Sequence, residues 1–199
     1  TASTDPTNTG SATATDNCSS VTITHTDVST QNADGITGNC DDYTYSITRT
    51  WKATDACGNM NTCNQTINVQ DILAPAITCP INVTIACTAS TAPSNTGSAT
   101  ATDNCSSVTI THTDVSTQNA DGIMGTCDDY TYTITRTWKA TDACGNMNTC
   151  NQTINVQDIL APAITCPINV TIACTASTDP TNTGSATATD NCSSVTITH

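Results

Sequence analysis

Aspartates are the most numerous residues in this chain that could do chemistry. All seventeen acidic residues are Asp, and with only four basic residues the net charge is −13. Carboxylate oxygens are hard ligands that suit divalent cations. So large a negative charge opposes binding to nucleic acid or to an anionic membrane. The acidity therefore indicates cation binding or simple solubility.

Thirteen cysteines form a second set. A zinc ribbon needs C-x2-C pairs, and the sequence has none. Free thiols in this number would require a reducing compartment and a use for them, whereas a disulfide framework forms in an oxidising one. We therefore expect disulfide bonds and an extracellular or cell-surface location.

Residues suited to catalysis are few. His25, His112 and His199 each end a Thr-Ile-Thr-His segment, and their spacing implies no nucleophile or carboxylate partner. The neighbouring acids Asp128 and Asp129 fall in an expected loop, where they lack the unlike environments that acid–base catalysis requires. We predict that the chain is not an enzyme.

All of these residues belong to a sequence repeat of 87 residues. The segment that starts at Thr1 returns at Thr88 and again at Thr175, and only seven of 112 pairs differ when the chain is aligned with itself at this offset. No apolar run of membrane length interrupts the copies. We expect a slice of a longer array, with a C-terminal portion (1–70), a complete copy (71–157) and an N-terminal portion (158–199).

Composition and alternation predict that each copy is all-β. The chain has no Glu, no Phe and only two Leu, but abundant Thr, Val and Ile. The inward residues are few, so disulfides would have to add stability. Arg136 falls on the Trp138 face, and we expect its guanidinium over an aromatic ring with its tip in water. The expected strands of the complete copy are 77–87, 98–105, 107–115, 130–142 and 149–157.

Several motifs of the complete copy resemble the hyalin repeat: APAITCP (74–80), TATDNC (100–105), and TWKATDACGN (137–146) with TCNQTINVQD (149–158). This family is an immunoglobulin-like extracellular module that occurs in tandem in surface proteins, generally as an adhesion or structural element. The resemblance implies tandem immunoglobulin-like β-sandwiches of about 87 residues, stapled by disulfides and arranged in a line. The middle segment TQNADGIMGTCDD (117–129) departs from the family pattern.

An immunoglobulin-like strand order also implies a cysteine pairing. It brings the first and last strands side by side, places the DNC and DACGN loops at one end, and leaves two cysteines for the opposite end. The implied pairs are Cys79–Cys150, Cys105–Cys144, Cys87–Cys127 and, in the first portion, Cys18–Cys57. The cysteines left for partners outside the chain are Cys40, Cys63, Cys166, Cys174 and Cys192.

The same strand order gathers acids at one end of the copy. Oxygen ligands at a junction between domains suit Ca²⁺, which takes six to eight of them. The alternative is that these aspartates cap turns through their own backbone. The expected ligands are Asp71, Asp103 and Asp142, with Asn104 and Asn146 close by, and Asp158 and Asp190 would begin the next site.

Asn-x-Ser/Thr sequons offer sites for covalent glycans. Four asparagines alternate out of phase with the buried residues and should face solvent; these are Asn64, Asn82, Asn151 and Asn169. Three others precede a Cys in an expected loop and are less accessible candidates: Asn17, Asn104 and Asn191. Bare amide surface is the alternative.

Together these features predict a structural component of an extended extracellular fibre or stalk, decorated with glycans. Its partners would be neighbouring copies of the same chain and other chains of a fibre, with no nucleic acid and no membrane insertion. The alternative is a multivalent adhesin that holds a surface or polysaccharide through repeated weak contacts.

Overall fold

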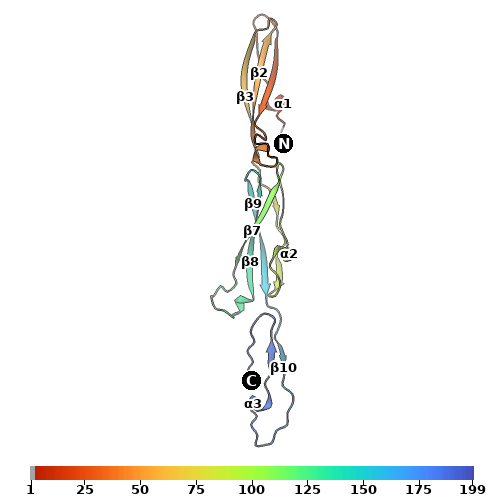
Figure 1. Cartoon of the computed structure of the whole chain (residues 1–199), viewed down its shortest axis with the longest axis vertical. Helices are drawn as coiled ribbons and strands as arrows, with labels where there is room; N and C mark the ends of the chain where they lie inside the picture. The colour runs from red at the N-terminus through yellow and green to blue at the C-terminus, as the bar shows by residue number, and fades with distance from the viewer. Residues whose placement is uncertain (1–2) are drawn as a thin grey trace. The chain divides into compact units, whose positions relative to one another are not determined.

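The computed structural model of the chain describes residues 3–199, and most of its regular structure is β-strand (Figure 1). The strands are β1 (Val21–Ser29), β2 (Tyr45–Asp55), β3 (Met60–Val69), β4 (Ala76–Thr78), β5 (Val83–Ala86), β6 (Thr100–Thr102), β7 (Val108–Ser116), β8 (Tyr132–Asp142), β9 (Met147–Gln157), β10 (Ala163–Thr165) and β11 (Thr187–Thr189). The helices are single turns: α1 (Pro6–Thr9), α2 (Pro93–Thr96), α3 (Pro180–Thr183) and the 3-10 turns η1 (Cys40–Asp42) and η2 (Cys127–Asp129). Within the described residues, no helix has the length and apolar character needed to cross a membrane.

The chain divides into two compact units. One takes the residues up to Thr78 together with 100–111 and 139–149, and the other takes 79–99, 112–138 and 150–199. These limits do not follow the 87-residue period of the sequence. The domain boundaries expected from that period, at 70/71 and 157/158, therefore stay a prediction.

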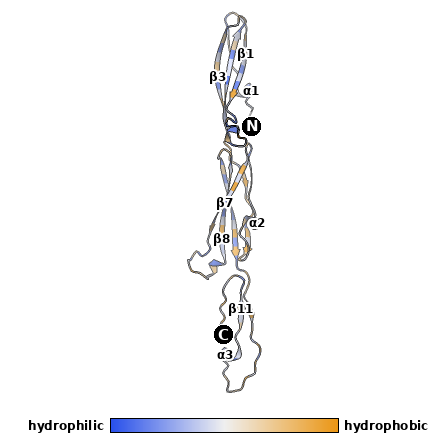
Figure 2. Ribbon diagram, in the orientation of Figure 1, coloured by the Kyte–Doolittle hydropathy of each residue, from blue (hydrophilic) through white to orange (hydrophobic). Residues whose placement is uncertain are grey.

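The first portion contains an antiparallel sheet in the order β1–β2–β3. Along β2 the side chains of Ile47, Arg49 and Trp51 are buried, whereas Thr48 and Lys52 between or beside them are exposed. This period of two is the pattern of a strand with one covered face. Figure 2 shows the same mixture of hydrophilic and hydrophobic residues along individual strands.

The complete copy contains a sheet in the order β5–β9–β8–β7, and β4 pairs separately with β6. The expected inward faces of β8 and β9 are confirmed, since Ile134, Trp138, Ile154 and Val156 are buried. Val83, Ile85, Cys87 and Tyr132 pack against the cluster that Ile134, Ile154 and Val156 form. The apolar core is small, as the composition predicts.

The strand predicted at 77–87 is wrong in one respect, because it is two strands. β4 ends before Pro80, which has no N–H to donate to a sheet, and β5 begins after the break and pairs parallel with β9. Ile81 lies in the break and is 82% exposed, although alternation places it inward. Gly97 fits against the break: its φ is +96°, and a Cβ there would lie 2.9 Å from Pro80 Cβ.

Arg136 corrects another expectation. Its guanidinium lies 5.8 Å from the Trp138 ring centroid, as predicted, but the residue is only 2% exposed, so its tip is not in water. Nε and Nη2 donate to the two carboxylate oxygens of Asp114 at 2.8 and 2.7 Å. Nη1 donates to Thr96 Oγ1 at 2.9 Å, and Nη2 donates to the Thr91 carbonyl at 2.8 Å. A buried charge is tolerated when it is paired and hydrogen-bonded in this way.

The network extends from Arg136 to β9. The Thr96 carbonyl accepts a hydrogen bond of 2.6 Å from Nε2 of the fully buried Gln152, and the same nitrogen donates to the Ile81 carbonyl at 3.0 Å. Strands β8 and β9, helix α2 and the segment before β5 are thus joined by polar contacts inside the copy. The arrangement recurs in the first portion, where Arg49 donates to Asp27, Thr9 and the Thr4 carbonyl.

We predict that Arg136→Met lowers the free energy of unfolding by about 3–5 kcal/mol, because it leaves the Asp114 carboxylate without its ion-pair partner and the buried Thr96 hydroxyl without a donor. Urea denaturation followed by circular dichroism measures the change. Lys139→Met is the matched control, since Lys139 lies on the other face of β8 and should alter stability by less than about 0.5 kcal/mol. Equal losses in both variants would contradict the role assigned to Arg136.

The hydrogen bonds from Arg136 hold the pKa of Asp114 below its usual value of 3.8. A lowered carboxyl pKa gives stability that is present above the ordinary value and disappears as the pH falls through the folded-state pKa. Asp114→Asn should therefore show a weaker loss of stability than the natural chain between about pH 5 and pH 2. Urea midpoints across this range test it.

Candidate calcium centre and disulfide sites at a repeat junction

Asp71 is a buried carboxylate without a partner. The residue is 7% exposed, and neither Oδ1 nor Oδ2 has a hydrogen-bond partner among the described residues. Its backbone is held firmly, since the N–H donates to Thr44 Oγ1 at 3.0 Å and the carbonyl accepts from Asn146 Nδ2 at 3.1 Å. Because burying an unpaired carboxylate is costly, this position calls for a proton or a cation.

Asp103 lies beside Asp71. One of its oxygens caps a turn and the other is available to a cation, the two alternatives that the sequence leaves open. Its Oδ1 caps the DNC turn by accepting from the backbone N–H groups of Cys105 and Ser106 at 2.9 and 3.0 Å. Its Oδ2 is buried and has no partner among the described residues. One oxygen each from Asp71 and Asp103 and the Cys105 sulfur lie within 4.8 Å of one another. One oxygen of Asp103 therefore serves the fold, while the other is free to bind an ion.

Asp142, at the end of β8, adds charge rather than a free oxygen. It is 6% exposed, and its carboxylate accepts from the Asn146 backbone N–H and from Asn146 Nδ2, both at 2.8 Å. Burial first, and then the charges of Asp103 and Asp142, raise the pKa of Asp71 above its usual value. The structure thus gathers the three predicted acids, but only Asp71 and Asp103 offer unpaired oxygens.

The donor set fits a hard cation. Asp71 supplies two free oxygens and Asp103 one, and water would have to complete the six to eight ligands of Ca²⁺. The Cys105 sulfur is a soft donor that Ca²⁺ does not favour. Sequence reasoning missed Thr44, which positions Asp71 through its hydroxyl, because nothing distinguishes this threonine among so many others.

The expected second site, at Asp158 and Asp190, repeats only part of the pattern. Asp190 Oδ1 accepts from Cys192 and Ser193, both at 2.9 Å, and the Asp158 N–H donates to Thr131 Oγ1 at 3.1 Å. The atoms that converge with the Asp158 carboxylate are the sulfurs of Cys87 and Cys192. These two cysteines are bonded to each other, so they are not ligands.

The cysteine pairing differs from the expectation in most places. Cys79 pairs with Cys150 as the resemblance implies, with 5.9 Å between the Cα atoms. The DNC and DACGN loops do lie together, since the Ala143 N–H donates to Ser106 Oγ at 3.3 Å. The other bonds are Cys40–Cys144 and Cys87–Cys192, in place of Cys105–Cys144 and Cys87–Cys127, and Cys18 does not pair with Cys57.

The error has a physical reason. Strand order within one copy predicts which loops share an end, but a cysteine from an adjoining copy can occupy that end too. Cys40 lies with its Cα 4.5 Å from that of Cys144, within bonding range. The 87-residue repeat could have indicated this, because it places the same cysteines in every copy and so offers each cysteine a partner in a neighbouring copy. Three disulfides also indicate an oxidising environment.

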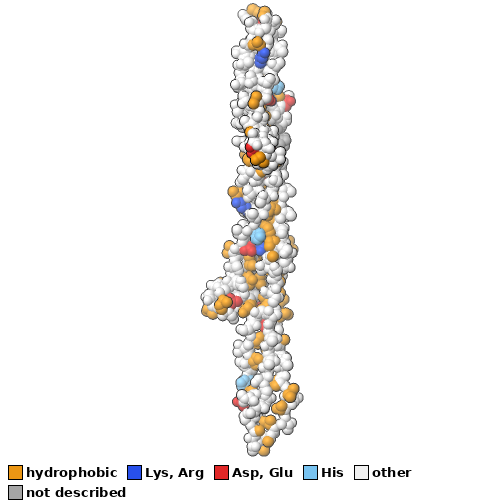
Figure 3. Space-filling view, in the orientation of Figure 1, with side chains coloured by type: hydrophobic (Ala, Val, Ile, Leu, Met, Phe, Trp, Pro, Cys, Tyr) orange, Lys and Arg blue, Asp and Glu red, His pale blue; other side chains and the backbone are white. Residues whose placement is uncertain are grey.

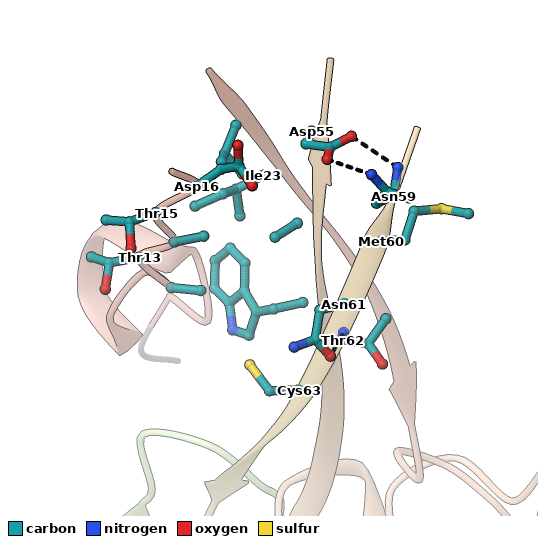
Figure 4. A pocket seen from close by; sticks show the side chains of 15 residues that line it. Thr13, Thr15, Asp16, Ile23, Asp55, Asn59, Met60, Asn61, Thr62 and Cys63 are labelled. Carbon is teal, nitrogen blue, oxygen red and sulfur yellow. Dashed lines mark hydrogen bonds between the residues drawn. The ribbon is translucent and has the colours of Figure 1, made fainter. Parts of the chain in front are cut away.

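A cavity of about 420 Å³ lies in the first portion, beside Trp51 (Figure 4). Asn61 and Cys63 border it. Their counterparts in the complete copy are occupied: Asn148 Nδ2 donates to the Pro75 carbonyl at 3.2 Å, and Cys150 is bonded to Cys79. The cavity therefore corresponds to the place that the segment around β4 fills in the complete copy, and we do not assign it a ligand.

The sequons lie on the surface. All seven asparagines are exposed, including the three that were expected to be less accessible: Asn17, Asn104 and Asn191. Figure 3 shows a face that is mostly uncharged side chains and backbone, with few acidic or basic groups. Glycan attachment at these asparagines stays a prediction.

No family model matches this chain, and a search of curated proteins finds no match. The likeness to hyalin repeats therefore depends on the sequence motifs themselves.

We predict that Ca²⁺ raises the melting temperature of the natural chain, because binding to the folded state offsets the buried Asp71 charge. At a hundredfold excess over Kd the gain is about 2.7 kcal/mol, or roughly 11–22 °C for a unit of this size. Thermal denaturation in Ca²⁺ and in chelator measures it. Asp71→Asn should abolish the response and, in chelator, be at least as stable as the natural chain.

Asp121→Asn removes an exposed loop carboxylate and is the control that should keep the response to Ca²⁺. If the natural chain melts at the same temperature with and without Ca²⁺, the centre does not bind it.

Proposed function

We propose that the chain is a structural part of an extended extracellular fibre or stalk, built from tandem immunoglobulin-like copies of the hyalin-repeat type that carry glycans. The observation that carries the proposal is the recurrence of one internal network at an offset of 87 residues. Arg49 and Arg136 each pair with an aspartate six residues after an equivalent valine, and each also donates to a threonine hydroxyl and a threonine carbonyl. Copies that share the same internal contacts are suited to joining end to end in an extended chain.

Chemistry outside the network supports the same function. The disulfides indicate an oxidising environment, and the exposed sequons leave room for glycans that would shield strand edges from pairing with other chains. The candidate calcium centre would stiffen the joint between copies. The three histidines lie one in each copy, and His25 and His112 lie against Trp51 and Trp138 rather than beside a nucleophile.

A multivalent adhesin is the second candidate, and one loop favours it. Ile123 and Met124 are 59% and 83% exposed in the segment before η2. The corresponding pair in the first portion is Ile36 and Thr37, so the copies differ at an exposed position. The isoleucine recurs, and Ile36 and Ile123, 61% and 59% exposed, could hold a ligand by repeated weak contacts.

Electron microscopy of the native assembly tests the fibre. Strand β8 has 11 residues, and at about 3.3 Å per residue an advance of roughly 30–40 Å per copy is expected. Long filaments with this axial repeat support the structural role. Isolated particles that bind polysaccharide would favour the adhesin, and isolated particles without any ligand would contradict both functions.

A further inference from the structure

Two of the three disulfides join different copies of the repeat. Cys40 belongs to the first portion and its partner Cys144 to the complete copy, and the Cα atoms are 4.5 Å apart. Cys87 belongs to the complete copy and its partner Cys192 to the last portion, with Cα atoms 6.1 Å apart. Both separations lie in the range that a disulfide spans.

The two bonds connect different positions of the repeat. Moved by 87 residues, Cys192 corresponds to Cys105 and Cys40 corresponds to Cys127. A bond of the Cys87–Cys192 kind would thus join Cys105 to the counterpart of Cys87 in a preceding copy. A bond of the Cys40–Cys144 kind would join Cys127 to the counterpart of Cys144 in a following copy.

The same translation accounts for every cysteine that the structure leaves unbonded. Each has a partner position beyond these 199 residues, in the same copy for Cys63 and Cys166 and in an adjoining copy for the other five. All six positions of the repeat are therefore used once and none is left over. These cysteines are Cys18, Cys57, Cys63, Cys105, Cys127, Cys166 and Cys174.

We propose that each junction between consecutive copies is crossed by two disulfides in addition to the peptide bond, while a third disulfide closes each copy internally. The partner of a copy is thus the next copy of the same chain, held at the positions of Cys87 with Cys192 and of Cys40 with Cys144. Each bond forms when two thiols lose two protons and two electrons to a disulfide-containing oxidant, which is reduced to two thiols.

Each of the two bonds has one sulfur in contact with a polar side chain. Thr44 Oγ1, which accepts from the Asp71 N–H, lies 3.5 Å from the Cys144 sulfur. At the other bond, Asn191 Nδ2 donates to the Cys87 sulfur at 3.6 Å. The inference does not depend on a fibre or on a ligand, since it concerns only which cysteines of this chain are bonded.

Cutting the chain between copies tests the proposal. A specific protease site inserted after Leu73, which is 58% exposed, lies between Cys40 and Cys144. After cleavage and alkylation of free thiols, we expect a single species of full mass in denaturant without reductant, and two fragments after reduction. A site inserted after Leu160 should behave in the same way through Cys87 and Cys192.

Two variants identify the bonds that hold the cut chain together. Cys40→Ser should let the fragments separate without reductant, whereas Cys63→Ser, which removes an unbonded cysteine of the same portion, should not. Fragments of the natural chain that separate without reductant would overturn the proposal. That is the result expected if Cys105 pairs with Cys144 and Cys87 pairs with Cys127 inside one copy.

A thiol count supplies a second measurement that needs no variant. Seven cysteines are unbonded in the chain, and a chain lengthened by one further copy should again show seven free thiols in denaturant, because three new disulfides form. Pairing inside each copy predicts five in both chains. A count of five would therefore refute the cross-copy bonds, whatever the filament images show.

Discussion

The guanidinium of Arg136 is a charged group in the interior of the complete copy. It is 2% exposed and makes four hydrogen bonds, to Asp114, Thr96 and Thr91. These bonds reach three elements: β7, α2 and the segment before α2. Because a buried charge is tolerated only while its partners stay in place, the charge makes the fold depend on all of them at once. In a chain with few large apolar residues, polar groups thus fix how these elements pack together.

The composition explains why such a device is needed. Thr-rich strands present one face of hydroxyls to water, and the other face carries few side chains larger than Val or Ile. In the complete copy the apolar cluster is Ile134, Ile154 and Val156 with their neighbours. Gln152, fully buried in the middle of β9, is satisfied by the carbonyls of Thr96 and Ile81. Hydrogen-bonded polar groups and disulfide bonds stabilise this interior, whereas large apolar side chains stabilise larger cores.

Sequence reasoning predicts the parts of the molecule that depend on local pattern. The alternation in β8 and β9 identifies the inward residues. The Cys79–Cys150 pair is implied by the resemblance to the hyalin repeat, whose strand order places the first and last strands together. Sequence reasoning fails where one residue overrides the pattern, as Pro80 does when it divides the strand and turns Ile81 outward. The acids around Asp71 could be grouped from topology, but which of their oxygens the turns consume depends on backbone geometry that spacing does not reveal.

The parallel pairing of β5 with β9 has a mechanical consequence. Val83 to Ala86 lie beside Ile154 to Gln157 and run in the same direction, so the polypeptide enters and leaves this pair at opposite ends. Tension applied to those ends would slide one strand along the other and strain all of their hydrogen bonds simultaneously, whereas an antiparallel pair would be unzipped bond by bond. The Cys79–Cys150 link closes the same two segments and limits the slide. The pair therefore resists tension applied between the start of β5 and the end of β9.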